Sequence, residues 1–126
     1  MNIPGNLKYT KDHEWIKVEG SVGIIGITDF AQGELGDIVY VDINPELTEL
    51  TAGESFGTIE AVKTVSDLYA PASGKVLELN KKLNDEPQLV NTDPYGEGWL
   101  IKVELSDASQ VNALLDAVSY QAQLGH

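Results

Sequence analysis

The chain has 126 residues, 20 acidic and eight basic side chains, a formal net charge of -12 and no cysteine. Its length fits a single domain over residues 1–126, and its 42% hydrophobic content is typical of a globular protein rather than a disordered one. The charge argues against nucleic acid or an anionic membrane as a partner, and the missing cysteine excludes disulfides, thiolate metal sites and thiol nucleophiles.

Short strands dominate the first part of the chain. The first two expected strands, residues 14–18 and 22–27, are joined by a short glycine-containing connection that indicates a hairpin. A helix of one or two turns follows, with Thr28 or Asp29 as its N-cap and Gly36 as a left-handed stop. The N-terminal region is therefore expected to be a hairpin followed by one small internal helix.

A second group of strands follows this helix. Residues 37–43 carry apolar side chains on both faces, which predicts a strand covered on both sides. The aromatic residues Trp15, Tyr40 and Trp99 are expected in or near the core. The remaining expected elements are strands at residues 54–62, 66–70, 75–80 and 99–105, with a polar loop at residues 80–94 that has room for a helical turn.

The chain is expected to end in an amphipathic helix of about residues 107–118, capped by Ser106 or Asp107. Its apolar side chains recur at i, i+3, i+4 and i+7: Val111, Leu114, Leu115 and Val118. Many short strands with little helix predict a mainly β fold. We expect an antiparallel β-sandwich or barrel, with a short internal helix and a C-terminal helix.

Catalytic and metal-binding patterns are scarce. The two histidines are His13 and the terminal His126, and a run of Asp12, His13 and Glu14 is more typical of a solvated strand entry than of a catalytic base. Distant histidines and scattered carboxylates lack the spacing of metal ligands. The phosphate-binding G-x-x-x-x-G-K-[ST] sequence is also absent. The residues therefore disfavour an enzyme and indicate no catalytic residues and no metal site.

Lys63 is the most informative residue. It falls at residues 62–65, the tip between two expected strands, and it is the only cation between residues 18 and 74. Glu60 and Asp67 bracket it. An exposed turn often carries a lysine for solubility, but a chain this charged does not need a cation there. Two interpretations stay open on this evidence, a solubilising lysine and a lysine presented for modification.

Ordered motifs along nearly the whole chain extend this observation. They lie at residues 7–9, 13–15, 26–32, 35–41, 60–63 with 66–67, 71–76 and 89–102. In these motifs the chain resembles the H-protein family of the glycine cleavage system. The family pattern often has serine where Ala61 stands and alanine where Thr64 stands. These departures leave the lysine and its acidic neighbours in place.

The resemblance implies a lipoyl/biotinyl-type β-sandwich, also called a barrel-sandwich hybrid, with lipoate in amide linkage to Lys63. It implies a non-catalytic shuttle that carries the aminomethyl group of glycine. The implied partners are glycine decarboxylase (P protein), aminomethyltransferase (T protein), dihydrolipoamide dehydrogenase (L protein) and a lipoate-attachment enzyme. A monomer is expected. Its place would be the cytoplasm, because no targeting pattern is visible, or the mitochondrial matrix if a presequence was removed.

An acidic cleft for the cationic aminomethyl group is a further expectation. The resemblance makes Glu14 and Asp67 plausible members, with Asp12 and Glu34 as weaker candidates. For each of the four, the alternative is a surface charge that serves solubility. Trp99 could line a groove in which the lipoyl arm rests, as an alternative to a core position.

Related lysine carriers fit the sequence less well. Biotinyl domains usually place methionine on both sides of the lysine, whereas Val62 and Thr64 flank Lys63. Lipoyl domains of 2-oxoacid dehydrogenases typically carry Asp-Lys-Ala at the tip and are shorter. Two other functions stay open: a relay that donates its arm to other lipoyl domains, and an unmodified acidic interaction module.

Overall fold

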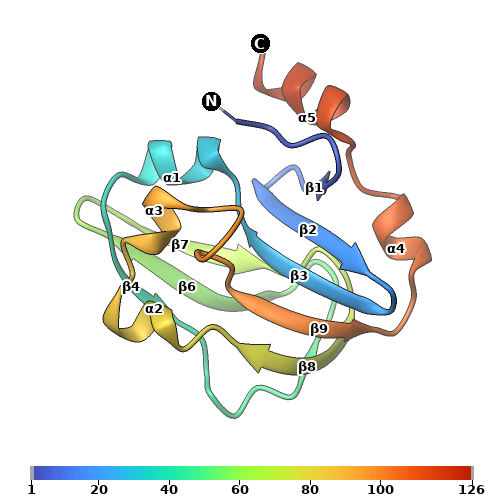
Figure 1. Ribbon diagram of the computed structural model, residues 1–126, viewed down its shortest axis with the longest axis horizontal. Helices are drawn as coiled ribbons and strands as arrows, with labels where there is room; N and C mark the ends of the chain where they lie inside the picture. Colours follow the sequence, from blue (N-terminus) through green and yellow to red (C-terminus); the bar gives the residue numbers. More distant parts are fainter. Residues whose placement is uncertain (1, 126) are drawn as a thin grey trace.

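Two antiparallel sheets enclose the main apolar core in the computed structural model, which describes residues 2–125 (Figure 1). The six-stranded sheet has the order β1 (Lys8–Tyr9), β2 (Glu14–Glu19), β3 (Val22–Ile27), β9 (Ile101–Leu105), β8 (Gly74–Leu79) and β5 (Glu49–Leu50). The three-stranded sheet has the order β4 (Ile38–Asp42), β6 (Ser55–Ala61) and β7 (Val65–Tyr69). The expected mainly β, antiparallel architecture is confirmed.

Among residues 2–125, five short helices pack beside the sheets or connect their strands. Thr28 is the N-cap of α1, its Oγ1 accepting a hydrogen bond from the Ala31 amide at 3.2 Å, and Gly36 ends the helix with a φ of +80°. Within the described residues, no helix is long and apolar enough to cross a membrane. The helices are α1 (Asp29–Leu35), α2 (Lys82–Asp85), α3 (Leu89–Thr92), α4 (Ser109–Asn112) and α5 (Ala117–Leu124).

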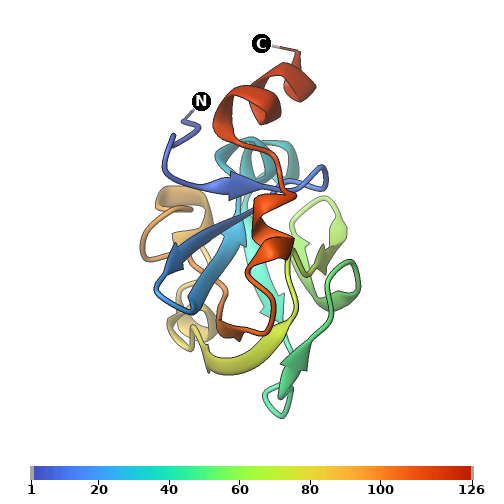
Figure 2. The ribbon, with the colours of Figure 1, turned by 90° about the vertical axis from the view of Figure 1, so that its right-hand side faces the viewer.

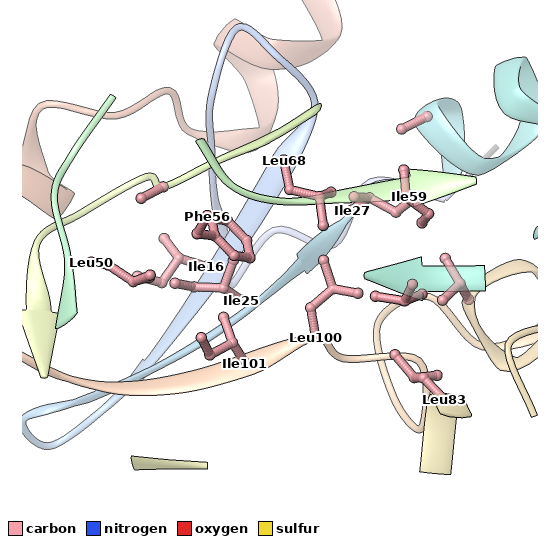
Figure 3. Packing of buried hydrophobic residues seen from close by; sticks show 14 of the residues in the cluster. Ile16, Ile25, Ile27, Leu50, Phe56, Ile59, Leu68, Leu83, Leu100 and Ile101 are labelled. Carbon is pink, nitrogen blue, oxygen red and sulfur yellow. The ribbon is translucent and has the colours of Figure 1, made fainter. Parts of the chain in front are cut away.

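The core forms where the inward faces of the two sheets meet (Figure 3). Ile25 and Ile101 come from the six-stranded sheet and Ile59 and Leu68 from the three-stranded sheet, all of them buried. Burial of such side chains is the main favourable term in folding. The sheet that carries the Lys63 hairpin is therefore held against the larger sheet.

The prediction that residues 37–43 are covered on both sides is wrong. Only Ile38 and Val41 of β4 are buried, while Tyr40 is 46% exposed. β4 is an edge strand of the smaller sheet, and a bulge between Ile38 and Tyr40 interrupts the alternation of its side chains. Trp15 is buried as expected and Trp99 is half-buried, but Tyr40 is not a core residue.

The single helix predicted for residues 107–118 is also wrong. The chain forms α4, leaves the helix and starts α5 only at Ala117. Between the two helices, Leu115 pairs with Tyr9 of β1 through two backbone hydrogen bonds of 2.8 and 2.9 Å. Asp116 then caps α5 by accepting from the Ser119 amide at 2.8 Å. This pairing with a distant strand interrupts a pattern that is locally helical (Figure 2).

Two glycine substitutions test how tightly the buried Trp15 ring packs against Gly26 of β3. A Cβ built on Gly26 would lie 2.7 Å from ring atoms of Trp15, whose Nε1 donates to the Pro94 carbonyl at 3.0 Å. We expect Gly26→Ala to lower the free energy of unfolding by about 1–3 kcal/mol, because the ring must move. Chemical denaturation measures this change.

Gly33→Ala is the matched control, because a Cβ on this α1 glycine would meet nothing within 4 Å. It should raise the free energy of unfolding by about 0.5–1 kcal/mol, since alanine is the better helix former. Equal effects of the two alanines would contradict the packing described for Trp15.

Candidate functional site

Lys63 lies exposed in the turn that joins β6 to β7, which projects beside α1 in Figure 1. The Ala61 amide donates to the Thr64 carbonyl at 2.8 Å across the turn. The Val62 amide donates to the Asp37 carbonyl at 3.1 Å and ties the turn to the start of β4. The backbone under Lys63 is thus held from two directions while its side chain faces solvent.

Asn91 of α3 stabilises the connection next to this turn. Its Oδ1 accepts from the Ile38 amide at 2.9 Å, and its Nδ2 donates to the Gly36 carbonyl at 2.9 Å and to Gln32 Oε1 at 3.0 Å. Sequence reasoning missed this residue. Its partners lie 53 to 59 positions away, so no local pattern indicates these contacts.

A cavity of about 290 Å³ opens between α1, β7 and the start of β2. The structure brings all four predicted cleft residues, Asp12, Glu14, Glu34 and Asp67, to its wall. The cavity wall therefore combines four acidic residues with a mostly apolar remainder. Its other lining residues are His13, Ile27, Phe30, Ala31, Leu35, Ile59, Ser66 and Leu68.

Lys63 is close to this cavity but does not line it. A Cβ built on Gly36 would lie 3.5 Å from the Lys63 Cε, so the lysine side chain lies over the C-terminal end of α1. The residue before this glycine, Leu35, lines the cavity. A flexible extension from Lys63 therefore starts next to the cavity wall.

Glu14 is the buried member of the acidic group, at 2% exposure. Its Oε1 accepts from the Thr10 hydroxyl at 2.6 Å and its Oε2 from the Tyr69 amide at 3.2 Å. Burial raises the pKa of Glu14 to about 7, despite these hydrogen bonds, which lower it. The interpretation of Glu14 as a solubilising surface charge is wrong, whereas Asp67, Asp12 and Glu34 are exposed.

His13 forms part of the same wall and is half-buried, not solvated as expected. It has a φ of +71°, and its ring lies 4.8 Å from the Phe30 ring, centroid to centroid. Its Nδ1 is 2.8 Å from the Tyr120 hydroxyl. Burial lowers the pKa of His13 below its usual value, although Asp12 and Glu34 act in the opposite direction. The other histidine, His126, lies outside the described residues.

A separate cavity has a volume of about 650 Å³. Trp99, Lys81 and Lys82 line it, and Lys63 does not. Trp99 also lies under the Lys102 ammonium, 4.6 Å from the ring centroid. Trp99 is thus absent from the wall of the acidic cavity. Among residues 2–125, no three carboxylate or histidine side chains gather as a metal site.

The raised pKa of Glu14 predicts a pH dependence of stability. In the unfolded chain Glu14 ionises near its ordinary value of 4.5, while in the folded protein it keeps its proton up to about pH 7. Folding therefore binds a proton between these values, and this contribution to stability is lost as the pH rises through 7. Glu14→Gln should remove this loss. The difference in free energy of unfolding, Glu14→Gln minus the parent, should increase by at most about 3 kcal/mol as the pH rises from 4 to 8.

Denaturant titrations of both proteins at a series of pH values measure this difference. Glu46→Gln, at an exposed position, is the control and should show no such trend. A Glu14→Gln difference that stays constant with pH would contradict a proton on Glu14 at neutral pH.

Comparison with known proteins places this geometry in a family. Residues 7–126 match the family model "Glycine cleavage H-protein". The chain is 60% identical to the glycine cleavage system H protein of Bacteroides thetaiotaomicron, covering 97% of each chain, and 58% identical to that of Symbiobacterium thermophilum, covering 96% of this chain and 94% of the relative. A crystal structure of a glycine cleavage system H protein from Mycobacterium marinum matches with a TM-score of 0.88 and 45% identity, over 98% of this chain and all of that one.

These matches also confirm the predicted lipoyl-type fold, built from two antiparallel sheets that do not close into a barrel. The resemblance carried by the motifs around Lys63 is confirmed over almost the full length. The chain belongs to the glycine cleavage H-protein family.

Proposed function

We propose that this protein is a non-catalytic lipoyl carrier of the glycine cleavage system, with lipoate attached through an amide to the Nζ of Lys63. The observation that carries the proposal is an exposed lysine on a clamped turn, beside an acidic and apolar cavity. The chain has no cysteine, so any thiol chemistry must come from an attached group. Bound lipoate would supply a dithiolane that accepts and releases the aminomethyl group.

Lys63 fits this attachment chemically. Among residues 2–125 the salt bridges involve other lysines, so the Lys63 amine is not held by a carboxylate. Amide formation removes its positive charge, which changes the formal net charge from -12 to -13 (-12 minus one). The clamped backbone gives a fixed point of attachment, and the side chain gives reach.

The cavity suits a cationic amine. Glu14 and Asp67 would accept charge-assisted hydrogen bonds from it, and the apolar wall would exclude the water that decomposes the carried group. Each Glu14 oxygen accepts one hydrogen bond in the structure and keeps a lone pair free for a ligand. A cation beside Glu14 would favour its ionised form, so binding of the amine would release a proton from this carboxyl group.

The partner enzymes would dock on the apolar surface around Lys63. Val62, Val65 and Val39 are large exposed apolar side chains on or beside the turn, and Val62 is 76% exposed. An enzyme that acts on the Lys63 amine itself would approach this surface. The proposed partners are the decarboxylase, the aminomethyltransferase, the dihydrolipoamide dehydrogenase and a lipoate-attachment enzyme. The proposed form is a single-domain monomer in the cytoplasm, or in the mitochondrial matrix after loss of a presequence.

Lys63→Arg tests the attachment site. Arginine keeps the positive charge but cannot form the lipoyl amide, so the intact mass of protein expressed with lipoate should lack the lipoyl increment. Support of glycine cleavage in a reconstituted system should fall to background, while the thermal midpoint stays unchanged because the side chain is exposed.

Lys75→Arg, at an exposed position on β8, is the matched control and should keep both the lipoyl mass and the activity. Normal activity of Lys63→Arg, or an unmodified Lys63 in the parent protein under these conditions, would contradict the carrier function.

Asp67→Asn and Glu14→Gln test the cleft. Each removes one charge-assisted contact with similar shape, so the protein carrying the aminomethyl group should release ammonia about tenfold faster in water. The rate of ammonia release from purified, loaded protein measures this effect. Glu46→Gln should release ammonia at the parent rate, because its side chain lies outside the cavity. Parent rates in both cleft variants would exclude these carboxylates from holding the amine.

A further inference from the structure

We propose that Tyr120 of α5 is a positioning residue that holds His13 as a neutral imidazole, protonated on Nε2, in the wall of the acidic cavity. The tautomer follows from the hydrogen bonds of the folded chain alone. Its consequence for a cationic cargo rests on the function proposed above.

Tyr120 connects the end of the chain to the cavity wall. It is fully buried, and its ring stacks on Tyr9 with centroids 4.7 Å apart and planes 7° from parallel. Its hydroxyl lies 2.8 Å from the Nδ1 of His13 and 2.8 Å from the Oγ1 of Thr28, which are 107 and 92 positions away in the sequence. A single hydroxyl group therefore joins α5 to the N-cap of α1 and to the cavity wall.

The direction of each hydrogen bond can be assigned by following the protons. Thr28 is fully buried, and its Oγ1 already accepts from the Ala31 amide. Its own hydroxyl proton needs an acceptor, and among the described residues its remaining partner is the Tyr120 oxygen. The proton of Tyr120 is then donated to His13 Nδ1. Because Nδ1 accepts, the proton of the neutral ring must be on Nε2.

Protonation of His13 would disrupt this chain of hydrogen bonds. A proton on Nδ1 would have to be donated to the Tyr120 oxygen, which would turn the Tyr120 proton toward Thr28 Oγ1. The buried Thr28 hydroxyl would then lose its acceptor. The hydrogen bonds from Tyr120 and Thr28 therefore oppose protonation of His13.

The surrounding charges act the other way. Asp12 from the preceding turn, Glu14 of β2, Glu34 of α1 and Asp67 of β7 line the cavity with His13. The charges of Asp12 and Glu34 favour an imidazolium. Glu14 keeps its proton up to about pH 7 and adds no charge below that pH. Partial burial of the ring disfavours its charged form, and so do the hydrogen bonds of Tyr120. Without the Tyr120 hydroxyl, the carboxylates should shift the balance toward a charged ring.

The backbone conformation and hydrogen bonds of His13 also hold its ring in this position. Its φ of +71° is a left-handed conformation that residues other than glycine adopt at a cost. The His13 amide donates to the Thr10 carbonyl at 3.2 Å, and its carbonyl accepts from the Thr28 amide at 3.0 Å. These bonds keep the ring between Phe30 and Tyr120.

A neutral His13 matters for the cargo. An imidazolium would be a cation inside the cavity and would compete with a cationic amine for Glu14, Asp67 and their neighbours. A neutral ring leaves the negative charge of the cavity available. Tyr120 is thus expected to influence retention of the amine without touching it.

Nuclear magnetic resonance of the full-length, unmodified protein tests the tautomer. The chain has two histidines, so two imidazole signals appear, and loss of one in His13→Gln assigns them. In the parent, long-range ¹H–¹⁵N correlation should show His13 protonated on Nε2, with a titration midpoint below 6.5. Tyr120→Phe keeps the stacked ring and should raise this midpoint by about one unit.

Val118→Ala, on the same helix but 77% exposed, is the control and should leave the midpoint unchanged. If Tyr120→Phe fails to fold, the tautomer of His13 in the parent protein tests the proposal by itself. Thr28→Ser keeps the hydroxyl group and should keep both the Nε2 tautomer and the parent midpoint. A parent ring protonated on Nδ1, or an unchanged midpoint in folded Tyr120→Phe, would overturn the proposal.

The pH profile of ammonia release tests the consequence. Protein carrying the aminomethyl group should release ammonia faster in Tyr120→Phe than in the parent at pH values between the His13 midpoints of the two proteins, and at the parent rate well above and well below them. Identical profiles would overturn the effect on cargo even if the tautomer is as stated. An unmodified Lys63 would overturn the carrier function but would leave the resonance experiment intact.

Discussion

The buried carboxylate of Glu14 is the interaction on which the functional end of this molecule depends. It starts β2 of the six-stranded sheet, and its Oε2 accepts from the Tyr69 amide of β7 in the three-stranded sheet. A single side chain therefore links the two sheets where the acidic cavity opens. An unpaired polar group there would be costly, and here both oxygens have donors. The same burial that raises its pKa makes the carboxyl group sensitive to a cation.

Near Glu14, the backbone of the Lys63 turn is fixed while the lysine side chain is free to move. The Lys63 turn is clamped by backbone bonds to Thr64 and Asp37, and Asn91 holds the neighbouring connection. None of these contacts uses the lysine side chain itself. Such an arrangement lets an extended arm move while its attachment point stays fixed, which suits a group passed between separate enzymes.

Much of the fold follows from local signals. The hairpin of β2 and β3, the Thr28 cap and the Gly36 stop were predictable because the responsible residues lie within a few positions of one another. The two failed predictions about the secondary structure and its coverage share a cause. Exposure of Tyr40 depends on β4 being a bulged edge strand, and the break before α5 depends on Leu115 pairing with Tyr9. Both are set by a partner distant in the sequence.

By itself, the sequence determined the antiparallel β architecture, the isolated lysine on a turn and the family, because alternation, turn residues and ordered motifs are local properties of the chain. It also pointed to the four carboxylates, through the resemblance. Only the tertiary structure decided that they share one cavity, that Glu14 is buried while Asp67 is exposed, and that Asn91 and Tyr120 support the site. The hydrogen bonds that join Glu14 to Tyr69, Asn91 to Ile38 and Tyr120 to His13 span 53 to 107 positions, and no local pattern encodes such contacts.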